Sequence, residues 1–334
     1  MKGVPTSLAA LSPEKRALFE ALLKKQGVAA PQGIPRREGT EPAPLSFSQE
    51  RLWFLDRMDP GSPAYNVPWT LRVRGALDVP LLERALGEVV RRHDALRTTF
   101  VLDGERPVQR VAPAGEVSLP VEDLSGVPAE AREAELRRRV GAAAWAPFDL
   151  EAGPVFRAIL YRLDSTDHLL LVSIHHTVTD GGSMGVLFRE LNAVYAAFAA
   201  GKPSPLHPLS IQYADFAVWQ RRHLSGKRLE DELAWWRARL DGAPAVLNLP
   251  TDRPRPTVHR YTGGGRSVTL PPAVLERLRA LALGDGATLY MVLLAAYATV
   301  LARWSGQDDV VVGTPIAGRH HREAEELIGY FANT

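Results

Sequence analysis

The stretch LLLVSIHHTVTDGG, residues 169–182, carries the strongest structural signal in this chain. Its first six residues are apolar or small on both faces of a strand, which predicts a strand buried on both sides. The glycine pair at its end favours a tight turn, and a helical stripe of apolar side chains follows. The stretch therefore predicts a central strand, a turn and a helix.

A second apolar run, residues 155–163, precedes this strand. The polar segment DSTD, residues 164–167, separates the two runs. Two such runs joined by a short polar turn are typical of an antiparallel hairpin. We therefore expect residues 155–163 and 168–176 to pair as neighbouring strands.

The adjacent histidines His175 and His176 are the first candidates for chemistry. Neighbouring residues in a strand point to opposite faces, so only one of them can face a given cleft. Histidine transfers protons near neutral pH, and a strand end before a glycine turn holds a ring rigidly. Asp180 is placed to fix the histidine directly, or to fix the turn through an arginine. The residues alone leave three interpretations open: a catalytic histidine, two satisfied core histidines, or a metal site.

Residues 181–185 read GGSMG and match G-x-S-x-G, the nucleophile elbow of α/β hydrolases, with Ser183 as the serine. In those enzymes the chain order is serine, acid, histidine, whereas the conspicuous histidines here precede the serine. An HGGG-type motif is missing and βαβ alternation is poor. The hydrolase interpretation is therefore the weaker one.

Helical periodicity predicts further elements on both sides of this region. It favours helices over residues 80–93, 130–146 and 289–304, and residues 309–314 predict a strand. We expect an N-terminal helix with a proline-rich linker over residues 1–44, one αβ lobe over 45–205, and a second lobe over 206–334. The boundary between the lobes falls in a stretch rich in proline and serine.

The composition excludes several classes of protein. The chain has 334 residues, a formal net charge of +2 and no cysteine, so disulfides and a thiol nucleophile are ruled out. The arginines are scattered without an aromatic-rich basic stripe, which argues against nucleic-acid binding. No apolar run is long enough to span a bilayer, and the N-terminus lacks the apolar core of a signal peptide. We expect no membrane partner and a cytoplasmic location.

The signature HHxxxDG over residues 175–181 resembles the active-site motif of condensation domains in non-ribosomal peptide synthetases. Wax-ester synthases, polyketide-associated acyltransferases and epimerization domains share that motif. Six further segments resemble condensation-domain motifs and occur in the family's order: LSFSQERLWFL (45–55), RHDALRTTF (92–100), PFDL (147–150), YADFAVWQ (213–220), GTPIAGR (313–319) and IGYFANT (328–334). Ser48 and Ala332 depart from the common pattern. The resemblance covers the chain from about residue 45 to its last residue.

This resemblance implies an α/β (α+β) fold of two chloramphenicol-acetyltransferase-like lobes in a V, the second lobe incomplete, with the active site in a tunnel between them. It implies that His176 is the catalytic residue and that His175 serves packing or hydrogen bonding. It makes Asp180 structural, through an ion pair with Arg97, and places Gly181 close to the substrate. Because the last residues lie inside a family motif, we expect a C-terminal truncation with apolar surface exposed near the end.

The resemblance also implies the reaction: an amide bond forms between a donor aminoacyl or peptidyl thioester and the amine of an acceptor aminoacyl thioester. Both groups are carried on the 4'-phosphopantetheine of carrier domains, one upstream and one downstream, and the domain binds no cofactor of its own. An adenylation domain is expected on the C-terminal side, and residues 65–68 resemble domains that accept an L-configured donor and an L-configured acceptor. The alternatives are a catalytically silent docking module and an O-acyltransferase of the same superfamily.

Overall fold

The computed structural model describes residues 33–39, 41–256 and 263–334, so the expected N-terminal helix lies outside the described part. The chain forms two compact units. The first holds the described residues up to Ser225 together with Ile316–Asn333, and the second holds the described residues of Gly226–Pro315 together with Thr334. The chain thus leaves the first unit after Ser225 and returns to it at Ile316.

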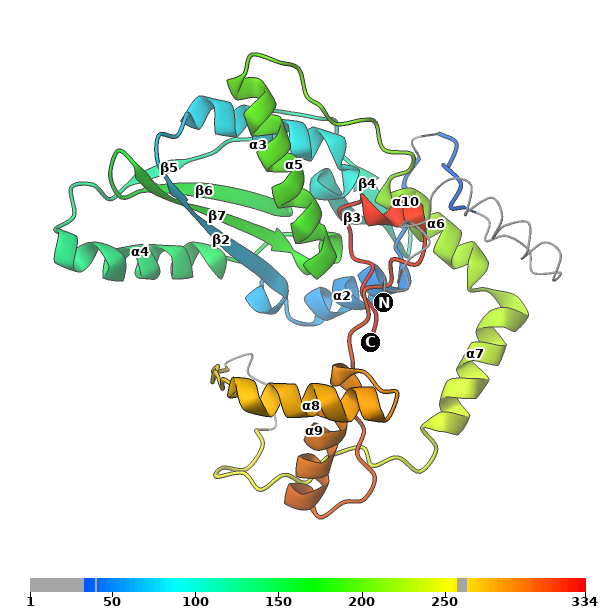
Figure 1. The fold of residues 1–334 in the computed structure, drawn as a ribbon. Coiled ribbons are helices and arrows are strands. Elements are labelled where there is room, and N and C mark those ends of the chain that lie inside the picture. The colour runs from blue at the N-terminus through cyan, green and yellow to red at the C-terminus, as the bar shows by residue number, and fades with distance from the viewer. Residues whose placement is uncertain (1–32, 40, 257–262) are drawn as a thin grey trace. The chain divides into compact units, whose positions relative to one another are not determined.

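The first unit is built on a four-stranded sheet with the order β2-β7-β6-β5 (Figure 1). Its three long strands are antiparallel, and β5 runs parallel to β6. The hairpin predicted from the two apolar runs is confirmed, since β6 pairs with β7 from Phe156–Ile174 to Arg162–His168. The strands are β2 (Asn66–Arg74), β5 (Val121–Asp123), β6 (Phe156–Arg162) and β7 (Asp167–His175).

Helices cover both faces of this sheet, which explains why β7 is apolar on both sides. Leu170, Val172 and Ile174 of β7 belong to the main core with α3 (Val79–Arg92) and α5 (Gly181–Ala199). Leu171, on the opposite face, packs in a second core with α4 (Ala129–Ala144). Figure 1 shows α3 and α5 on one side of the sheet and α4 on the other. The helices predicted over residues 80–93 and 130–146 are therefore confirmed.

A smaller sheet and several short elements complete the first unit. The sheet has the order β1-β4-β3, and residues 43–44 of the expected linker form its first strand. Ile34 and Ala43 are also buried, so the expected linker contributes two apolar side chains to this unit. The remaining elements are β1 (Ala43–Pro44), β3 (Thr98–Asp103), β4 (Arg106–Val111), α2 (Phe47–Met58), α6 (Tyr213–His223), α10 (Arg322–Glu325) and the 3-10 helices η2 (Pro63–Tyr65), η3 (Asp94–Arg97) and η4 (His176–Val178).

The second unit contains α7 (Gly226–Arg239), α8 (Pro272–Gly284) and α9 (Leu289–Ser305), so the helix predicted over residues 289–304 is confirmed. The strand predicted over residues 309–314 is wrong. A strand needs a neighbour to receive its backbone hydrogen bonds, and within the described chain only an isolated bridge forms nearby, between Ile316 and Asn333. The apolar run VVV, residues 310–312, therefore stays irregular.

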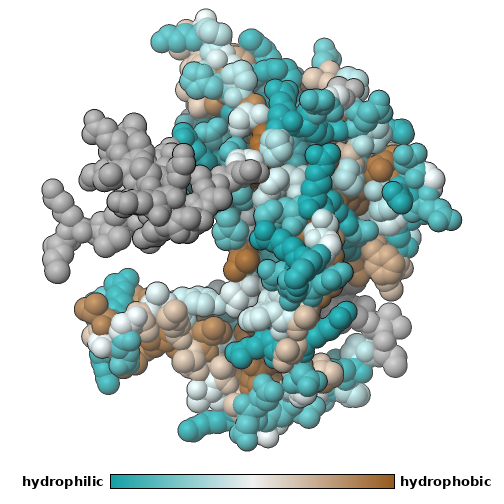
Figure 2. Space-filling view, turned by 90° about the vertical axis from the view of Figure 1, so that its right-hand side faces the viewer, coloured by the Kyte–Doolittle hydropathy of each residue, from teal (hydrophilic) through white to brown (hydrophobic). Residues whose placement is uncertain are grey.

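Large apolar side chains are exposed on this second unit, as expected near the C-terminus. Leu283 is 84% exposed and Trp304 is 67% exposed. Figure 2 shows apolar side chains at the molecular surface. No single described helix is long and apolar enough to cross a membrane, although α8 and α9 pass the length and composition test as a pair bent by 106°.

Candidate functional site

His176 is the first residue after β7, at the start of η4. The chain leaves the strand at this point, one residue earlier than predicted, and the imidazole is half-buried. Its Nδ1 lies 2.6 Å from the carbonyl oxygen of Thr179. A carbonyl accepts hydrogen bonds only, so Nδ1 carries a proton, and in the neutral imidazole Nε2 is the nitrogen with the lone pair. Among the residues the structure describes, nothing hydrogen-bonds to Nε2.

His175 has the opposite environment. It is the last residue of β7, is only 2% exposed, and faces the same side of the sheet as Ser173. Its Nδ1 lies 2.8 Å from the hydroxyl of Thr177, and its ring makes edge contacts with Phe148 and Tyr65. Burial, with the neighbouring His176 as a smaller cause, lowers the pKa of His175 to about 4. His175 is therefore a neutral packing residue at neutral pH.

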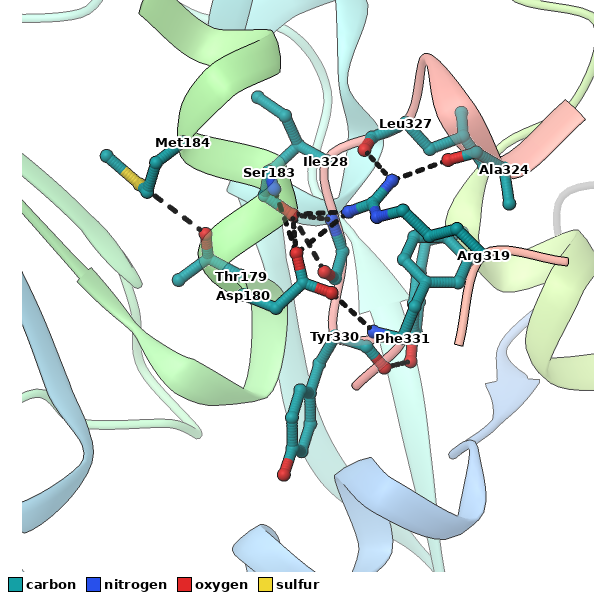
Figure 3. Close-up of polar contacts among 12 residues, drawn as sticks. Thr179, Asp180, Ser183, Met184, Arg319, Ala324, Leu327, Ile328, Tyr330 and Phe331 are labelled. Atoms are coloured by element: carbon teal, nitrogen blue, oxygen red, sulfur yellow. Dashed lines mark hydrogen bonds and ion pairs between the residues drawn. The ribbon is translucent and has the colours of Figure 1, made fainter. Parts of the chain in front are cut away.

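Asp180 lies at the N-terminus of α5, where its Oδ1 accepts the backbone N–H of Ser183 as an N-cap. The same carboxylate forms an ion pair with Arg319, at 2.9 Å between Nη2 and Oδ1, and accepts the backbone N–H of Phe331 at 3.0 Å. Figure 3 shows these contacts joining the start of α5 to the C-terminal segment. Asp180 is 3% exposed, so its charge is held away from water by partners on two elements.

The expected ion pair between Asp180 and Arg97 is wrong. Arg97 ends η3, and its Nη2 pairs with Asp94, three residues before it. Its Nη1 and Nη2 also donate to the backbone carbonyls of Ala112 and Arg91. A partner three residues away needs no long-range placement, so this local pair forms readily. Arg319, from the segment that returns to the first unit, is the arginine that pairs with Asp180, which is the role predicted for Arg97.

Ser183 does not have the surroundings of a nucleophile. It is fully buried, and its Oγ lies 2.8 Å from both Asp180 Oδ1 and Arg319 Nη2. It also accepts the backbone N–H of Gly329 at 3.0 Å. A nucleophile elbow requires an exposed hydroxyl beside a histidine base, so the hydrolase interpretation fails on geometry.

The glycine pair after Asp180 has two different environments. A Cβ at Gly181 would meet no described atom within 4 Å, so the expected closeness of Gly181 to substrate stays a prediction. A Cβ at Gly182 would lie 2.9 Å from Nε of Arg319, closer than non-bonded atoms tolerate. A side chain at position 182 would therefore press on the guanidinium that pairs with Asp180.

Tyr330 was not among the residues singled out from the sequence, although it lies inside the motif IGYFANT. Its ring contacts the ring of His176, with the centroids 4.6 Å apart and the planes inclined by 53°. No local pattern signals this contact, because the two residues are far apart along the chain. Within the described ranges, no group of three or more His, Cys, Asp or Glu side chains is placed to hold a metal ion.

A comparison with protein families matches the condensation domain over residues 40–334, which is most of the chain. The chain belongs to the condensation-domain family. It is homologous to the condensation domains of non-ribosomal peptide synthetases. In this condensation domain two motifs of the family, HHxxxDG and GTPIAGR, meet in space through Asp180 and Arg319.

Curated relatives of this condensation domain are much longer proteins. Phosphinothricin tripeptide synthetase PhsC of Streptomyces viridochromogenes is 46% identical over 336 residues, covering 100% of this chain and 31% of the relative. A linear gramicidin synthase of Brevibacillus parabrevis is 47% identical over 316 residues, covering 94% of this chain and 6% of the relative. The chain thus spans about a third or less of these relatives.

Solved structures confirm the mixed α/β fold expected from the sequence. The complex of the X-domain and OxyB from teicoplanin biosynthesis is 32% identical with a TM-score of 0.81, covering 91% of this chain and 66% of that chain. The first condensation domain of the CDA synthetase is 28% identical with a TM-score of 0.72, covering 88% of this chain and 70% of that chain. The condensation domain therefore shares its architecture with both.

Proposed function

We propose that this condensation domain joins two carrier-bound acyl groups through an amide bond. The donor is an aminoacyl or peptidyl thioester, and the acceptor is the α-amine of a second aminoacyl thioester. The observation that carries the proposal is the environment of His176. Its Nδ1 proton is fixed by the Thr179 carbonyl, while Nε2 has a lone pair without a partner in the described structure.

In the proposed reaction the acceptor amine attacks the donor carbonyl carbon, the new C–N bond forms, and the C–S bond of the donor breaks. Nε2 of His176 accepts a proton from the attacking nitrogen, and that proton ends on the departing thiolate of the donor arm. General base catalysis of this kind contributes typically ~10²–10⁴-fold. Holding two activated thioesters in attack geometry contributes further.

The proposed transfer is direct, without an acyl-enzyme. The chain has no cysteine, and Ser183 is buried within the network of Asp180 and Arg319. A serine whose hydroxyl is occupied on every side offers no path to a thioester carbonyl. The proposed attack by the acceptor amine on the donor therefore needs no nucleophile from the protein.

The partners follow from the substrates. We propose that an upstream carrier domain presents the donor and a downstream carrier domain the acceptor, each through 4'-phosphopantetheine, in a cytoplasmic synthetase with an adenylation domain on the C-terminal side. The same proposal includes an L-configured donor and an L-configured acceptor. It also includes a V arrangement of two lobes, with the chain divided into residues 1–44, 45–205 and 206–334 and the second lobe incomplete. The exposed apolar side chains of the second unit support the proposal that the second lobe is incomplete.

The test uses the full-length protein with both carriers loaded. We expect His176→Ala to reduce dipeptide formation by about 10²-fold or more, while adenylation and carrier loading continue unchanged. His176 is half-buried and caps no described element, so the melting temperature of the domain should stay close to wild type. An enzyme that is fully active after His176→Ala would reject the proposed role.

A second candidate is a docking module without catalytic activity. One similar structure is a complex of an X-domain with OxyB, so a domain of this fold is found bound to a second protein. The same assay separates the candidates, because a silent module forms no dipeptide with either wild-type chain or variant. Retained dipeptide formation by the wild-type domain would reject this alternative.

A further inference from the structure

Tyr330 contacts the ring of His176 and lies on a segment that the rest of the first unit holds at many points. The ring centroids are 4.6 Å apart, within the range in which aromatic pairs attract each other. Tyr330 is only half-buried, and its neighbour Phe331 is buried against Tyr213 and Phe216. The backbone therefore enters the core at Phe331 and leaves the Tyr330 ring beside the histidine.

Hydrogen bonds fix this backbone on both sides of Tyr330. The Gly329 N–H donates to Ser183 Oγ at 3.0 Å, and the Phe331 N–H donates to Asp180 Oδ2 at 3.0 Å. The hydroxyl of Tyr213 donates to the carbonyl oxygen of Tyr330 itself. A Cβ at position 329 would overlap the Tyr213 ring, so only glycine allows this approach. Three consecutive residues are thus held by side chains from α5 and α6.

The side chain of Tyr330 takes no part in that polar network. Figure 3 shows it extending away from Asp180 and Arg319, and its hydroxyl has no hydrogen-bond partner among the described residues. Burial raises the pKa of the Tyr330 phenol, so the ring is neutral at physiological pH. What Tyr330 presents to His176 is an uncharged aromatic surface held in one position.

We propose that Tyr330 is a positioning residue for His176, and that the Asp180–Ser183–Arg319 network serves to hold it there. Both the hydrogen bond to Thr179 and the contact with the Tyr330 ring limit rotation of the imidazole about its side-chain bonds. The Nδ1–H tautomer and the direction of Nε2 are then fixed together. The catalytic consequence rests on the function proposed above for His176.

The first test measures the imidazole directly in the unliganded chain. With ¹⁵N-labelled histidine, the His176 resonances are assigned by their loss in His176→Gln, and the Nδ1 and Nε2 shifts at pH 8 report the tautomer. We expect a dominant Nδ1–H tautomer in wild type and in Tyr330→Phe, and a mixture in Tyr330→Ala. Tyr297→Ala, a truncation of an exposed tyrosine in the second unit, is the matched control.

Two results would overturn the proposal: an unchanged tautomer in Tyr330→Ala, or loss of the fixed tautomer in Tyr330→Phe, which would assign the role to the hydroxyl. If Tyr330→Ala does not fold, Tyr330→Leu replaces it, because leucine keeps most of the volume without the planar ring. The same tautomer measurement on Tyr330→Leu then decides the proposal. The resonances of His175, which Tyr330 does not contact, report whether the surrounding fold is intact.

The second test measures turnover with loaded carriers in the full-length protein. Misplacement of a reacting group lowers the rate rather than binding, so kcat should fall by about 10- to 100-fold in Tyr330→Ala with an unchanged KM for both carriers. Tyr330→Phe should retain wild-type kcat. If His176→Ala is fully active, the function proposed for His176 fails while the tautomer measurement still decides the positioning role.

Discussion

At the scale of single residues, two neighbouring histidines differ in their surroundings, because the strand ends at the first of them and a turn begins at the second. His175 completes β7 and is packed among aromatic rings, whereas His176 opens η4 and keeps one ring nitrogen free of described partners. The same residue type is therefore enclosed by packing at one position and half-buried at the next, with a ring nitrogen that is unpartnered among the described residues.

The buried His175 makes a prediction about pH. Its pKa is about 4 in the folded chain and about 6.5 when unfolded, so the unfolded state binds more protons between these values. Stability contributed by the neutral ring is complete above pH 6.5 and is lost as pH falls toward 4. Once the pH is below 4, the lost unfolding free energy should amount to on the order of 3 kcal/mol. Urea unfolding at pH 7.5, 6, 5 and 4.5 measures it.

His175→Asn is the control for that experiment, because asparagine hydrogen-bonds without titrating. We expect the variant to be less stable than wild type at pH 7.5 and to lose less stability on acidification. An equal loss in both proteins would show that other groups, such as the buried His93, dominate the acid response.

At the scale of elements, one carboxylate connects α5 to a segment that lies more than a hundred residues further along the chain. Asp180 caps the helix, pairs with Arg319 and accepts the Phe331 N–H. Because all of these partners are buried or nearly so, removing one leaves the others unsatisfied. The motif aspartate therefore holds two distant segments together, and the ring of His176 contacts Tyr330 beside this junction.

A double-mutant cycle tests which arginine Asp180 uses. We expect Asp180→Asn and Arg319→Met each to cost about 3–5 kcal/mol of unfolding free energy, with a coupling of about 1–3 kcal/mol between them. Arg97→Met should cost about 0–1 kcal/mol and should be additive with Asp180→Asn. Chemical denaturation of the five variants decides it, and coupling to Arg97 instead of Arg319 would contradict the structure.

The glycine pair offers a second test at this scale. Gly182→Ala places a methyl group against Nε of an Arg319 whose guanidinium is already held by Asp180 and two backbone carbonyls. We expect it to lower the unfolding free energy by about 1–3 kcal/mol, as overpacking does. Gly181→Ala, one residue earlier on the same helical turn, should leave stability within about 1 kcal/mol, because its Cβ meets open space. Thermal melts that rank the two variants in the reverse order would contradict this account.

At the scale of the whole molecule, the two units differ in how they bury apolar groups. The first unit has a continuous core on both faces of its sheet, whereas many large apolar side chains of the second unit remain exposed. Exposed apolar surface of this kind favours association. The average molecular mass of the chain in solution should therefore rise with concentration, whereas that of an ordinary monomer stays constant.

We expect the isolated chain to self-associate at micromolar concentrations through the second unit. Leu283→Lys combined with Trp304→Arg removes two strongly exposed apolar groups and should shift the chain toward monomer in light scattering. Leu102→Lys, a change at an exposed position of the first unit, is the matched control and should have little effect. Equal effects of both changes would show that exposure in the second unit does not drive association.

Local patterns in the sequence determined the hairpin of β6 and β7, the long helices and the catalytic candidate, because strand and helix periodicity and the HHxxxDG motif act over a few residues. The tertiary structure decided which arginine meets Asp180, why the hydroxyl of Ser183 is occupied, and that Tyr330 lies beside His176. Of the two arginines, Arg97 is the nearer in sequence to HHxxxDG, yet it forms its ion pair locally with Asp94. Contacts across such separations depend on how the folded elements bring distant segments together, and no local periodicity encodes that arrangement.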